Sequence, residues 1–306
     1  MQVLECVANV STSDAAVVET MCAVVAASGA ALLDRHTDAD HARSVLTMAA
    51  PAAVIAAAAA DLAGCCLDLV DITTHAGVHP RLGALDVCPF VPIGFETGVA
   101  GLDAALESAG GAAREIAALG IPVFAYDRLS PTAVSLPHVR RDAFGGLAPS
   151  WGPPRPHPRA GATAVGVRDV LVALNIDLGG EKAGLQAAHA IAAEVREAGG
   201  GPAGLRAIGL ELVRQGRVQV SMNLTRPWEC GVGTAWNAVA AAAGRHGVDI
   251  GSGELVGLVP VRALDDAGAD VLDRCAITPE RTLEAALVAK GLRDGGAGPL
   301  RLPVLA

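Results

Sequence analysis

The segment from Thr74 to Phe90 carries the residues of this chain that are best suited to chemistry. It places two histidines, an arginine and an aspartate between two apolar runs. Titratable side chains at the edge of a core need partners or a function. His79 is the candidate general base, because an imidazole accepts and returns a proton near neutral pH. Arg81 offers a planar fork of donors that suits a carboxylate. The alternative is a turn that holds one hydrogen-bonded core histidine.

Covalent catalysis and metal chemistry have weaker support. The sequence has no G-x-S-x-G motif, and Cys88 lies in an apolar run, so the pattern favours direct transfer through a general base. Asp38, Asp40 and His41 form a polar cluster whose residue types suit a hard metal ion. An exposed acidic loop is the commoner explanation of such a cluster, and we therefore predict no metal site.

The composition predicts a globular protein that does not bind nucleic acid. The 306 residues are 52% hydrophobic but only 3% aromatic, and the net charge is −9. Contacts with phosphates need clustered Lys and Arg, and binding of single strands needs aromatic stacking platforms. The chain offers neither, so we expect small-molecule partners.

The cysteines and the N-terminus indicate a cytoplasmic protein. The seven cysteines are odd in number, form no CxxC pair and lie mostly in apolar runs, which is typical of reduced, buried thiols. The chain begins without a basic region or a long apolar segment, so no signal peptide is expected. The Ala-rich run 54–60 is too short to cross a bilayer, and we expect no membrane partner.

The elements that must position these residues follow an α/β (α+β) pattern. In the first half, apolar periodicity and capping residues predict strands and helices in the order β-α-β-β-α-β, at 3–8, 14–28, 30–33, 44–48, 51–63 and 67–72. This is the order of a ferredoxin-like fold. Three further elements are expected, namely a strand, a helix and a strand at 84–93, 98–118 and 122–126.

The second half repeats this order. The same signals predict β-α-β-β-α-β at 163–178, 182–198, 207–213, 218–224, 232–244 and 255–259. Short helices near 279–290 precede a Pro-containing tail. Two such units indicate an internal duplication with domains 1–178 and 179–306, and ligands commonly bind in the cleft between such halves.

A Pro-rich stretch at 129–159 interrupts the regular pattern. The run Trp151-Gly152-Pro153-Pro154 is incompatible with a helix or a central strand. One interpretation is a linker between domains. The other is a shaped loop that lines a pocket, because a stiff segment loses little entropy when it orders around a ligand.

The central segment also resembles the signature of a known family. His75-x-Gly77-x-His79-Pro80-Arg81-x-Gly83-Ala84-Leu85-Asp86-Val87-Cys88-Pro89-Phe90 is similar to the signature of glutamate formimidoyltransferases, also called formiminotransferases. Further similar motifs occur in the family's order over residues 1–268: Glu5-Cys6-Val7-x-Asn9-x-Ser11, Leu32-Leu33-Asp34, Arg43-Ser44-Val45, Leu136-Pro137-x-Val139-Arg140, Gly161-Ala162-Thr163, Gly166-x-Arg168, Asn175-Ile176-x-Leu178, Gln219-Val220-Ser221-x-Asn223-Leu224-Thr225 and Leu255-Val256-Gly257-Leu258-Val259-Pro260.

This resemblance implies two ferredoxin-like subdomains with a ligand tunnel between them, in which folate is held. It also implies transfer of a formimidoyl group between glutamate and N5 of tetrahydrofolate, giving 5-formimidoyltetrahydrofolate, with His79 as the catalytic histidine. The cyclodeaminase half of the bifunctional animal enzyme is expected to be absent, and a homodimer is expected. The folate-binding loop implied by the resemblance comprises Gly152, Pro153, Pro154, Arg155, Pro156, His157, Pro158, Arg159, Ala160 and Gly161.

The substrate-binding candidates are charged or amide residues of the resembling motifs. The transferred group is cationic, so Asp34 or Asp86 suits it better than an oxyanion hole, although both carboxylates also fit a role as caps of strand ends. Glutamate presents two carboxylates that need arginine partners, for which the chain offers Arg43, Arg81, Arg168 and Arg226. The remaining candidates are His36, Asn175 and Asn223.

Several neighbours of these residues depart from the family pattern. His36 replaces an acidic residue, Ala42 replaces the usual Asn, Val78 replaces the common Glu, and Arg226 stands where Asp is usual. Three hypotheses follow: a glutamate formimidoyltransferase, a folate-dependent transferase of the same fold that acts on another amine, and a non-catalytic folate-binding paralogue.

Overall fold

The computed structural model describes residues 2–75, 81–93, 99–297 and 300. Its contacts divide the chain into two compact units, which meet in sequence between Asp169 and Val170 and are described separately below. The sequence placed this boundary nine residues later, after residue 178. The strand at Val172–Gly179 therefore belongs to the second unit.

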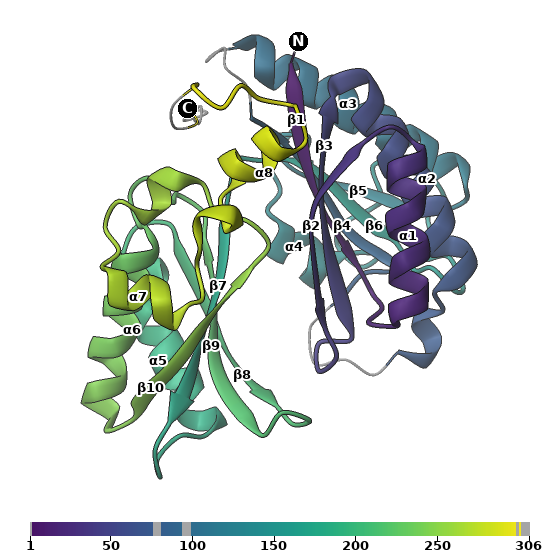
Figure 1. Cartoon of the computed structure of the whole chain (residues 1–306). Coiled ribbons are helices and arrows are strands. Elements are labelled where there is room, and N and C mark those ends of the chain that lie inside the picture. Colours follow the sequence, from purple (N-terminus) through teal and green to yellow (C-terminus); the bar gives the residue numbers. More distant parts are fainter. Residues whose placement is uncertain (1, 76–80, 94–98, 298–299, 301–306) are drawn as a thin grey trace. The chain divides into compact units, whose positions relative to one another are not determined.

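The first unit contains a six-stranded sheet (Figure 1). Its strands are β1 (Val3–Val10), β2 (Ala31–Asp38), β3 (Arg43–Pro51), β4 (Leu85–Pro92), β5 (Val123–Asp127) and β6 (Thr163–Val167), in the order β2-β3-β1-β4-β6-β5. The first four strands pair antiparallel, whereas β6 lies parallel to both β4 and β5. The helices are α1 (Ala15–Ala27), α2 (Ala52–Leu69), α3 (Val99–Ala118) and α4 (Leu136–Asp142). The elements β1 to β4 therefore have the predicted ferredoxin-like order, with β5 and β6 added at one edge.

The strand predicted at 67–72 is wrong. Leu67 to Leu69 form the last turn of α2, and a short 3-10 helix follows at Ile72–Thr74. The run is short and apolar, and such a run fits a buried helix end as well as a strand. Cys66 and Leu62 are buried on the same face of α2, which extends the helical period through this stretch. The fourth strand of the motif is β4 instead, so the segment with the candidate base lies between a helix and a strand.

One face of the sheet packs on the three long helices, and Figure 1 shows α1, α2 and α3 together on that side. Alternate residues of β1, such as Cys6 and Ala8, enter this core together with Met48 of β3 and Ile55 of α2. Alanines at the contacts let helices and sheet approach closely. On the opposite face, α4 covers β4, β5 and β6 with an apolar cluster of Val87, Phe124, Tyr126, Val139, Ala162 and Ala164. The remainder of that opposite face, over β1, β2 and β3, carries polar side chains.

Helix α2 is long and apolar enough to cross a membrane by length and composition alone. Its buried residues, among them Ile55, Leu62 and Cys66, belong to the core of the first unit. This packing is that of a core helix.

The second unit is a four-stranded antiparallel sheet with a complete βαββαβ order. Its elements are β7 (Val172–Gly179), α5 (Leu185–Val195), β8 (Leu205–Leu212), β9 (Arg217–Leu224), α6 (Val232–His246) and β10 (Asp249–Val256). The strand order β10-β7-β9-β8 matches that of β1 to β4, and the predicted repetition is confirmed. The single strand predicted at 163–178 is wrong, because β6 and β7 lie in different sheets and are separated at the polar pair Arg168-Asp169. Helices α7 (Ala269–Arg274) and α8 (Leu283–Ala289) follow.

Candidate active site

The hairpin of β2 and β3 carries several predicted site residues on one face. The sequence predicted a polar loop from residue 37, but β2 continues to Asp38 and pairs with β3 throughout. Residues directly opposite one another in an antiparallel pair share a face. Asp34 lies opposite Thr47, His36 opposite Val45, and Asp38 opposite Arg43. Thr47 and Val45 alternate with the core residues Leu46 and Met48, so these pairs occupy the face that the three long helices leave uncovered.

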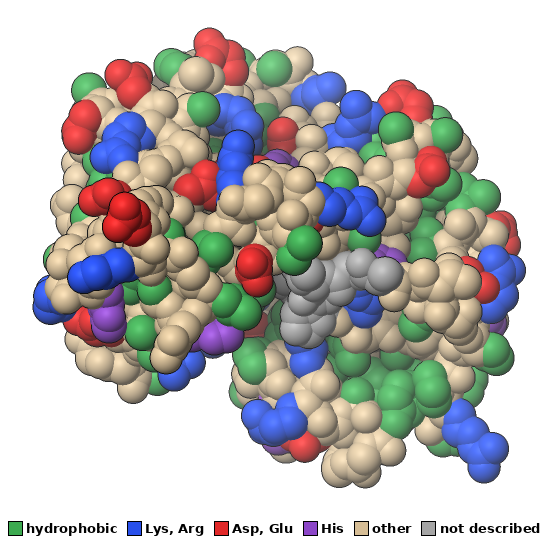
Figure 2. Space-filling model, turned by 90° about the horizontal axis from the view of Figure 1, so that it is seen from below, with side chains coloured by type: hydrophobic (Ala, Val, Ile, Leu, Met, Phe, Trp, Pro, Cys, Tyr) green, Lys and Arg blue, Asp and Glu red, His purple; other side chains and the backbone are tan. Residues whose placement is uncertain are grey.

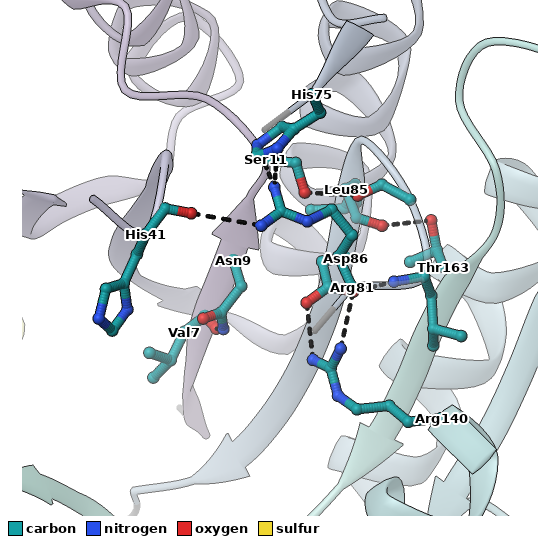
Figure 3. Close-up of polar contacts among 12 residues, drawn as sticks. Val7, Asn9, Ser11, His41, His75, Arg81, Leu85, Asp86, Arg140 and Thr163 are labelled. Carbon is teal, nitrogen blue, oxygen red and sulfur yellow. Dashed lines mark hydrogen bonds and ion pairs between the residues drawn. The ribbon is translucent and has the colours of Figure 1, made fainter. Parts of the chain in front are cut away.

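Asp86 is the charged centre of a buried cluster in the first unit (Figure 3). The residue is only 1% exposed, and its carboxylate accepts hydrogen bonds from Arg140 Nη2 (2.7 Å) and from the backbone N–H of Leu82 (2.6 Å). Arg140 Nη1 approaches the same carboxylate at 3.4 Å. Arg140 comes from the short helix α4, which Ser135-Leu136-Pro137 begins. The pair therefore links α4 to the start of β4.

Arg81 connects the central segment to the turn between β2 and β3. Its guanidinium contacts the His75 ring and donates through Nη2 to the carbonyl oxygen of His41 (3.3 Å). His75 Nε2 donates to the carbonyl oxygen of Ala42 (2.8 Å). Ala42 has φ +44°, a conformation that non-glycine residues seldom adopt. The two described residues that flank the candidate base are thus both held against one tight turn.

The electrostatics of this cluster favour an anionic ligand. The pKa of the Arg43 guanidinium is lowered to about 10, chiefly by burial; the charge of Asp86 raises it, and the charges of Arg140 and Arg81 lower it. Burial also lowers the pKa values of Arg81 and His75. Three guanidinium groups therefore act on one another and on one carboxylate. An incoming carboxylate would relieve their mutual repulsion.

A second buried carboxyl group, that of Glu5 on β1, lies on the face of the sheet that the three long helices leave uncovered. Glu5 is 5% exposed, and burial raises its pKa to about 7, with the charge of Arg168 acting in the opposite direction. Arg168 Nη1 donates to the carbonyl oxygen of Asp169 (2.8 Å). Arg168 therefore acts on Glu5 and does not belong to the cluster around Asp86.

The C-terminal end of the Pro-rich loop lies beside the central segment. Ala84 N donates to the carbonyl oxygen of Ala160 (2.9 Å), Ala162 N to that of Leu82 (3.1 Å), and Ile72 N to that of Arg159 (3.0 Å). Gly161 has φ +67°, and a Cβ there would stand 2.3 Å from the carbonyl oxygen of Leu82. The loop is therefore anchored by its backbone to both sides of the segment that contains the candidate base.

The remaining loop residues are mostly exposed. The loop begins at Trp151, whose backbone pairs with Val123 of β5, and Gly152 to Pro156 are exposed. His157 Nδ1 accepts from the backbone N–H of Ala160 (3.0 Å) and of Arg159 (3.3 Å), which shapes the turn before Gly161. Pro158 and Arg159 are exposed, and Arg159 lies 3.4 Å from Asp71. The loop lies within the first unit and does not connect the two units, so the linker interpretation is wrong, whereas a role in lining a pocket stays a prediction.

Three predicted residues belong to the second unit. Asn175 of β7 donates from Nδ2 to Glu254 of β10 (3.1 Å). Asn223 lies on β9 and is exposed. Arg226 pairs with Glu197 at 2.5 Å and with Glu229 at 3.5 Å, next to Gly204 with φ +77°. Arg226 therefore connects to the turn before β8, and its contact with a substrate stays a prediction.

His79 and Val78 lie outside the described residues. Arg140 was not predicted as a site residue, although it ends the motif Leu136-Pro137-x-Val139-Arg140. A buried aspartate at the start of a strand requires a cationic partner, and this requirement could have identified an arginine such as Arg140. No group of three or more His, Cys, Asp or Glu in the described ranges is placed to hold a metal ion. Figure 2 shows acidic and basic side chains interspersed on the face that it draws.

Comparison with known proteins assigns both units to one family. Residues 3–168 match the family model of the formiminotransferase domain, N-terminal subdomain, and residues 173–294 match that of the formiminotransferase domain. The chain is 36% identical over 278 residues to a protein named glutamate formimidoyltransferase from Streptococcus pyogenes serotype M1, covering 87% of this chain and 91% of that protein. A protein of the same name from Thermoplasma acidophilum is 30% identical, with coverage of 87% and 91%. The formimidoyltransferase-cyclodeaminase of Sus scrofa is 34% identical, and the match covers 88% of this chain and 52% of that protein.

Proposed function

The chain belongs to the formiminotransferase family, and we propose that it is a folate-dependent formimidoyltransferase that moves a formimidoyl group between glutamate and N5 of tetrahydrofolate. The observation that carries this proposal is the match of both units to the family, with coverage of 91% of a relative named glutamate formimidoyltransferase. The geometry of the first unit also supports this function.

The arginine cluster suits the carboxylates of glutamate. Arg43, Arg81 and Arg140 gather around the single carboxylate of Asp86, and their electrostatic interactions with one another are unfavourable. Guanidinium groups bind carboxylates through paired hydrogen bonds. Glutamate presents two carboxylates that such groups can bind and a simple amine presents none, which supports glutamate as the substrate.

His79 is the proposed general base. The attacking amine must lose a proton before it adds to the amidine carbon, and the departing nitrogen must regain one. A single imidazole performs both tasks near neutral pH. His75 and Arg81, which flank this residue in the sequence, are fixed to the turn at His41 and Ala42, and this anchoring supports a role in positioning.

The chemistry of the second unit fits a folate. Gln219 of β9 is 1% exposed, and its Nε2 has no hydrogen-bond partner in the described part of the chain. It lies opposite Asp177 of β7, and Asn175 and Glu254 occupy the same face, two residues further along. Amide and carboxylate side chains match the alternating N–H and C=O groups along the edge of a pterin ring. Gln219 and Asn175 would hold that edge, and the loop 152–161 is the second proposed folate contact. When bound, tetrahydrofolate supplies the N5 amine that accepts the group.

An assay with purified protein tests the function. The protein is incubated with tetrahydrofolate and N-formimidoylglutamate, and the folate absorbance is followed. Turnover is expected with glutamate as the partner amine. The reverse reaction, from 5-formimidoyltetrahydrofolate to a panel of amines, distinguishes the acceptors. Turnover with another amine but not with glutamate would replace the proposed substrate. No turnover with any amine would favour the folate-binding paralogue.

The role of His79 has its own test. His79→Ala should leave the affinity for tetrahydrofolate nearly unchanged and lower kcat by roughly 10²- to 10⁴-fold, which is the usual contribution of a general base. In the wild type, ionisation of the imidazole should give the pH profile of kcat one limb. That limb should be absent from the profile of the variant. Wild-type turnover in this variant would contradict the assignment of the base.

A further inference from the structure

Two buried polar atoms of the first unit have no hydrogen-bond partner among the residues that the structure describes. One is Oγ1 of Thr47, whose residue is only 1% exposed, and the other is Oδ2 of Asp34. The two residues lie directly opposite one another on β3 and β2. Antiparallel neighbours in this relation have Cβ atoms about 4.5–5.5 Å apart. The two atoms without partners therefore lie close together on the same face of the sheet.

Such a pair calls for an explanation, because buried polar groups are nearly always hydrogen-bonded. The hydroxyls of the same hairpin follow this rule on the other face, where Ser44 Oγ lies 2.9 Å from Thr37 Oγ1 and donates to the carbonyl oxygen of Thr12 (2.8 Å). Thr47 and Asp34 instead face the side that the long helices leave uncovered, next to Val7 of β1. A buried site with an open acceptor and an apolar neighbour suits a ligand that brings its own donors.

We propose that Asp34 and Thr47 bind the cationic formimidoyl group of the substrate. This inference rests on the proposed function and names which residues recognise the transferred group. The protonated group, –NH–CH=NH2⁺, has only N–H donors at its end. Asp34 Oδ2 accepts one of them and balances the charge, and Thr47 Oγ1 accepts another. Thr47 was not among the residues expected to contact a substrate.

Of the two carboxylates predicted to stabilise this group, only Asp34 has an oxygen available. Asp86 is engaged by Arg140 and by the backbone N–H of Leu82, so its role is to hold the arginine cluster. Asp34 forms no such contact among the described residues, and one of its oxygens is buried without a partner.

Thr47 shares a face of the sheet with the arginine cluster. Thr47 and Arg43 lie four residues apart on the same face of β3, which corresponds to about 13 Å between their Cα atoms. The Arg43 guanidinium interacts with Asp86, Arg140 and Arg81. The substrate would thus lie on this face, with its formimidoyl group at Thr47 and a carboxylate at the arginine cluster.

Two ligands that differ only in this group provide the test. N-formimidoylglutamate presents a cationic =NH2⁺, whereas N-formylglutamate presents a neutral carbonyl oxygen in the same position. Their dissociation constants are measured by calorimetry for the wild type, Asp34→Asn and Thr47→Val. The wild type should prefer the formimidoyl ligand. Asp34→Asn should reduce this preference at least tenfold, because an asparagine amide donates to the formyl oxygen, and Thr47→Val should weaken binding of the formimidoyl ligand roughly 5- to 20-fold.

Stability measurements separate recognition from a structural role. Thr47→Val removes a buried hydroxyl that has no partner and keeps the shape, so its melting temperature should equal or exceed that of the wild type. Thr20→Val is the matched control, because the Thr20 hydroxyl is exposed on α1 and donates to the carbonyl oxygen of Ala16 (2.9 Å). This control should keep the wild-type ratio of the two dissociation constants.

The outcomes distinguish failure of the residue assignment from failure of the proposed function. If the wild type binds N-formimidoylglutamate and both variants keep its preference over N-formylglutamate, the assignment of Asp34 and Thr47 is refuted while the proposed function stands. A large fall in melting temperature of Thr47→Val, without a change in ligand preference, would also refute it. If the wild type binds neither ligand and shows no turnover, the proposed function itself fails.

Discussion

Replacement of Arg140 by methionine tests the electrostatic organisation of the site. The methionine keeps most of the apolar stem but removes the guanidinium that donates to Asp86 at 2.7 Å. Asp86 is 1% exposed, and the Arg140 side chain is 17% exposed, so the pair is largely shielded from water. Loss of one partner from a buried pair typically costs about 3–5 kcal/mol.

The expected cost here is smaller than that range. Asp86 retains the hydrogen bond from Leu82 N and the nearby charges of Arg43 and Arg81. We therefore expect Arg140→Met to lower the free energy of unfolding by about 2–3 kcal/mol. Asp86→Asn combined with Arg140→Met should cost at least 1 kcal/mol less than the sum of the single changes, because the double variant removes both members of the Asp86–Arg140 pair at once.

Urea unfolding followed by circular dichroism provides the measurement. Arg141→Met is the matched control on the same helix: its side chain is 67% exposed and pairs with a partly exposed Asp142, so the change should cost less than about 0.5 kcal/mol. A cost below about 1 kcal/mol for Arg140→Met, or strictly additive effects in the double variant, would refute the buried-pair argument.

Two further predictions concern Glu5 and Gly161. Burial raises the pKa of Glu5 from 4.5 to about 7, so the folded state holds this proton more tightly than the unfolded state does. The free energy of unfolding should therefore be highest below pH 4.5 and should fall as the pH rises towards 7. Glu5→Gln should abolish this loss and be more stable than the wild type at pH 8, by up to about 3 kcal/mol in thermal or urea unfolding, whereas equal pH dependence of both proteins would contradict the burial effect. Gly161→Ala should cost more than Gly216→Ala by about 1–3 kcal/mol, because both glycines have positive φ but only the first would place a Cβ against the Leu82 carbonyl. Equal melting temperatures of these two variants would show that the backbones of 82 and 161 are not in close contact.

The sequence was sufficient for the repeated βαββαβ order because strand periodicity and helix caps are local signals. The run at 67–72 was predicted wrongly as a strand, since its length fits both the last turn of α2 and a strand. The division at Asp169 was missed for a related reason: the apolar residues of β6 and β7 follow each other closely, and only their pairing with different sheets separates them.

The candidate site was predictable in its residue types but not in its partners. His75, Arg81 and Asp86 come from one motif, whereas Arg140 lies 54 residues beyond Asp86 and reaches it only through the placement of α4. The partners of Arg226 were likewise not predictable, because its pairing with Glu197 depends on the loop before β8. Thr47 could not be found from the sequence, since a missing hydrogen bond is visible only in three dimensions. The tunnel, the cytoplasmic location and the homodimer stay predictions.

The backbone contacts of residues 159–162 have a consequence for local opening of the fold. The same four residues hold Ile72, which precedes the segment with His79, and Leu82 and Ala84, which follow it. A fluctuation that detaches this stretch releases both sides at once, so the amides of Ile72, Ala84 and Ala162 should exchange hydrogen as one cooperative unit. A ligand that orders the Pro-rich loop would then slow exchange at all three amides together, which couples occupancy of the loop to the backbone on both sides of the proposed base.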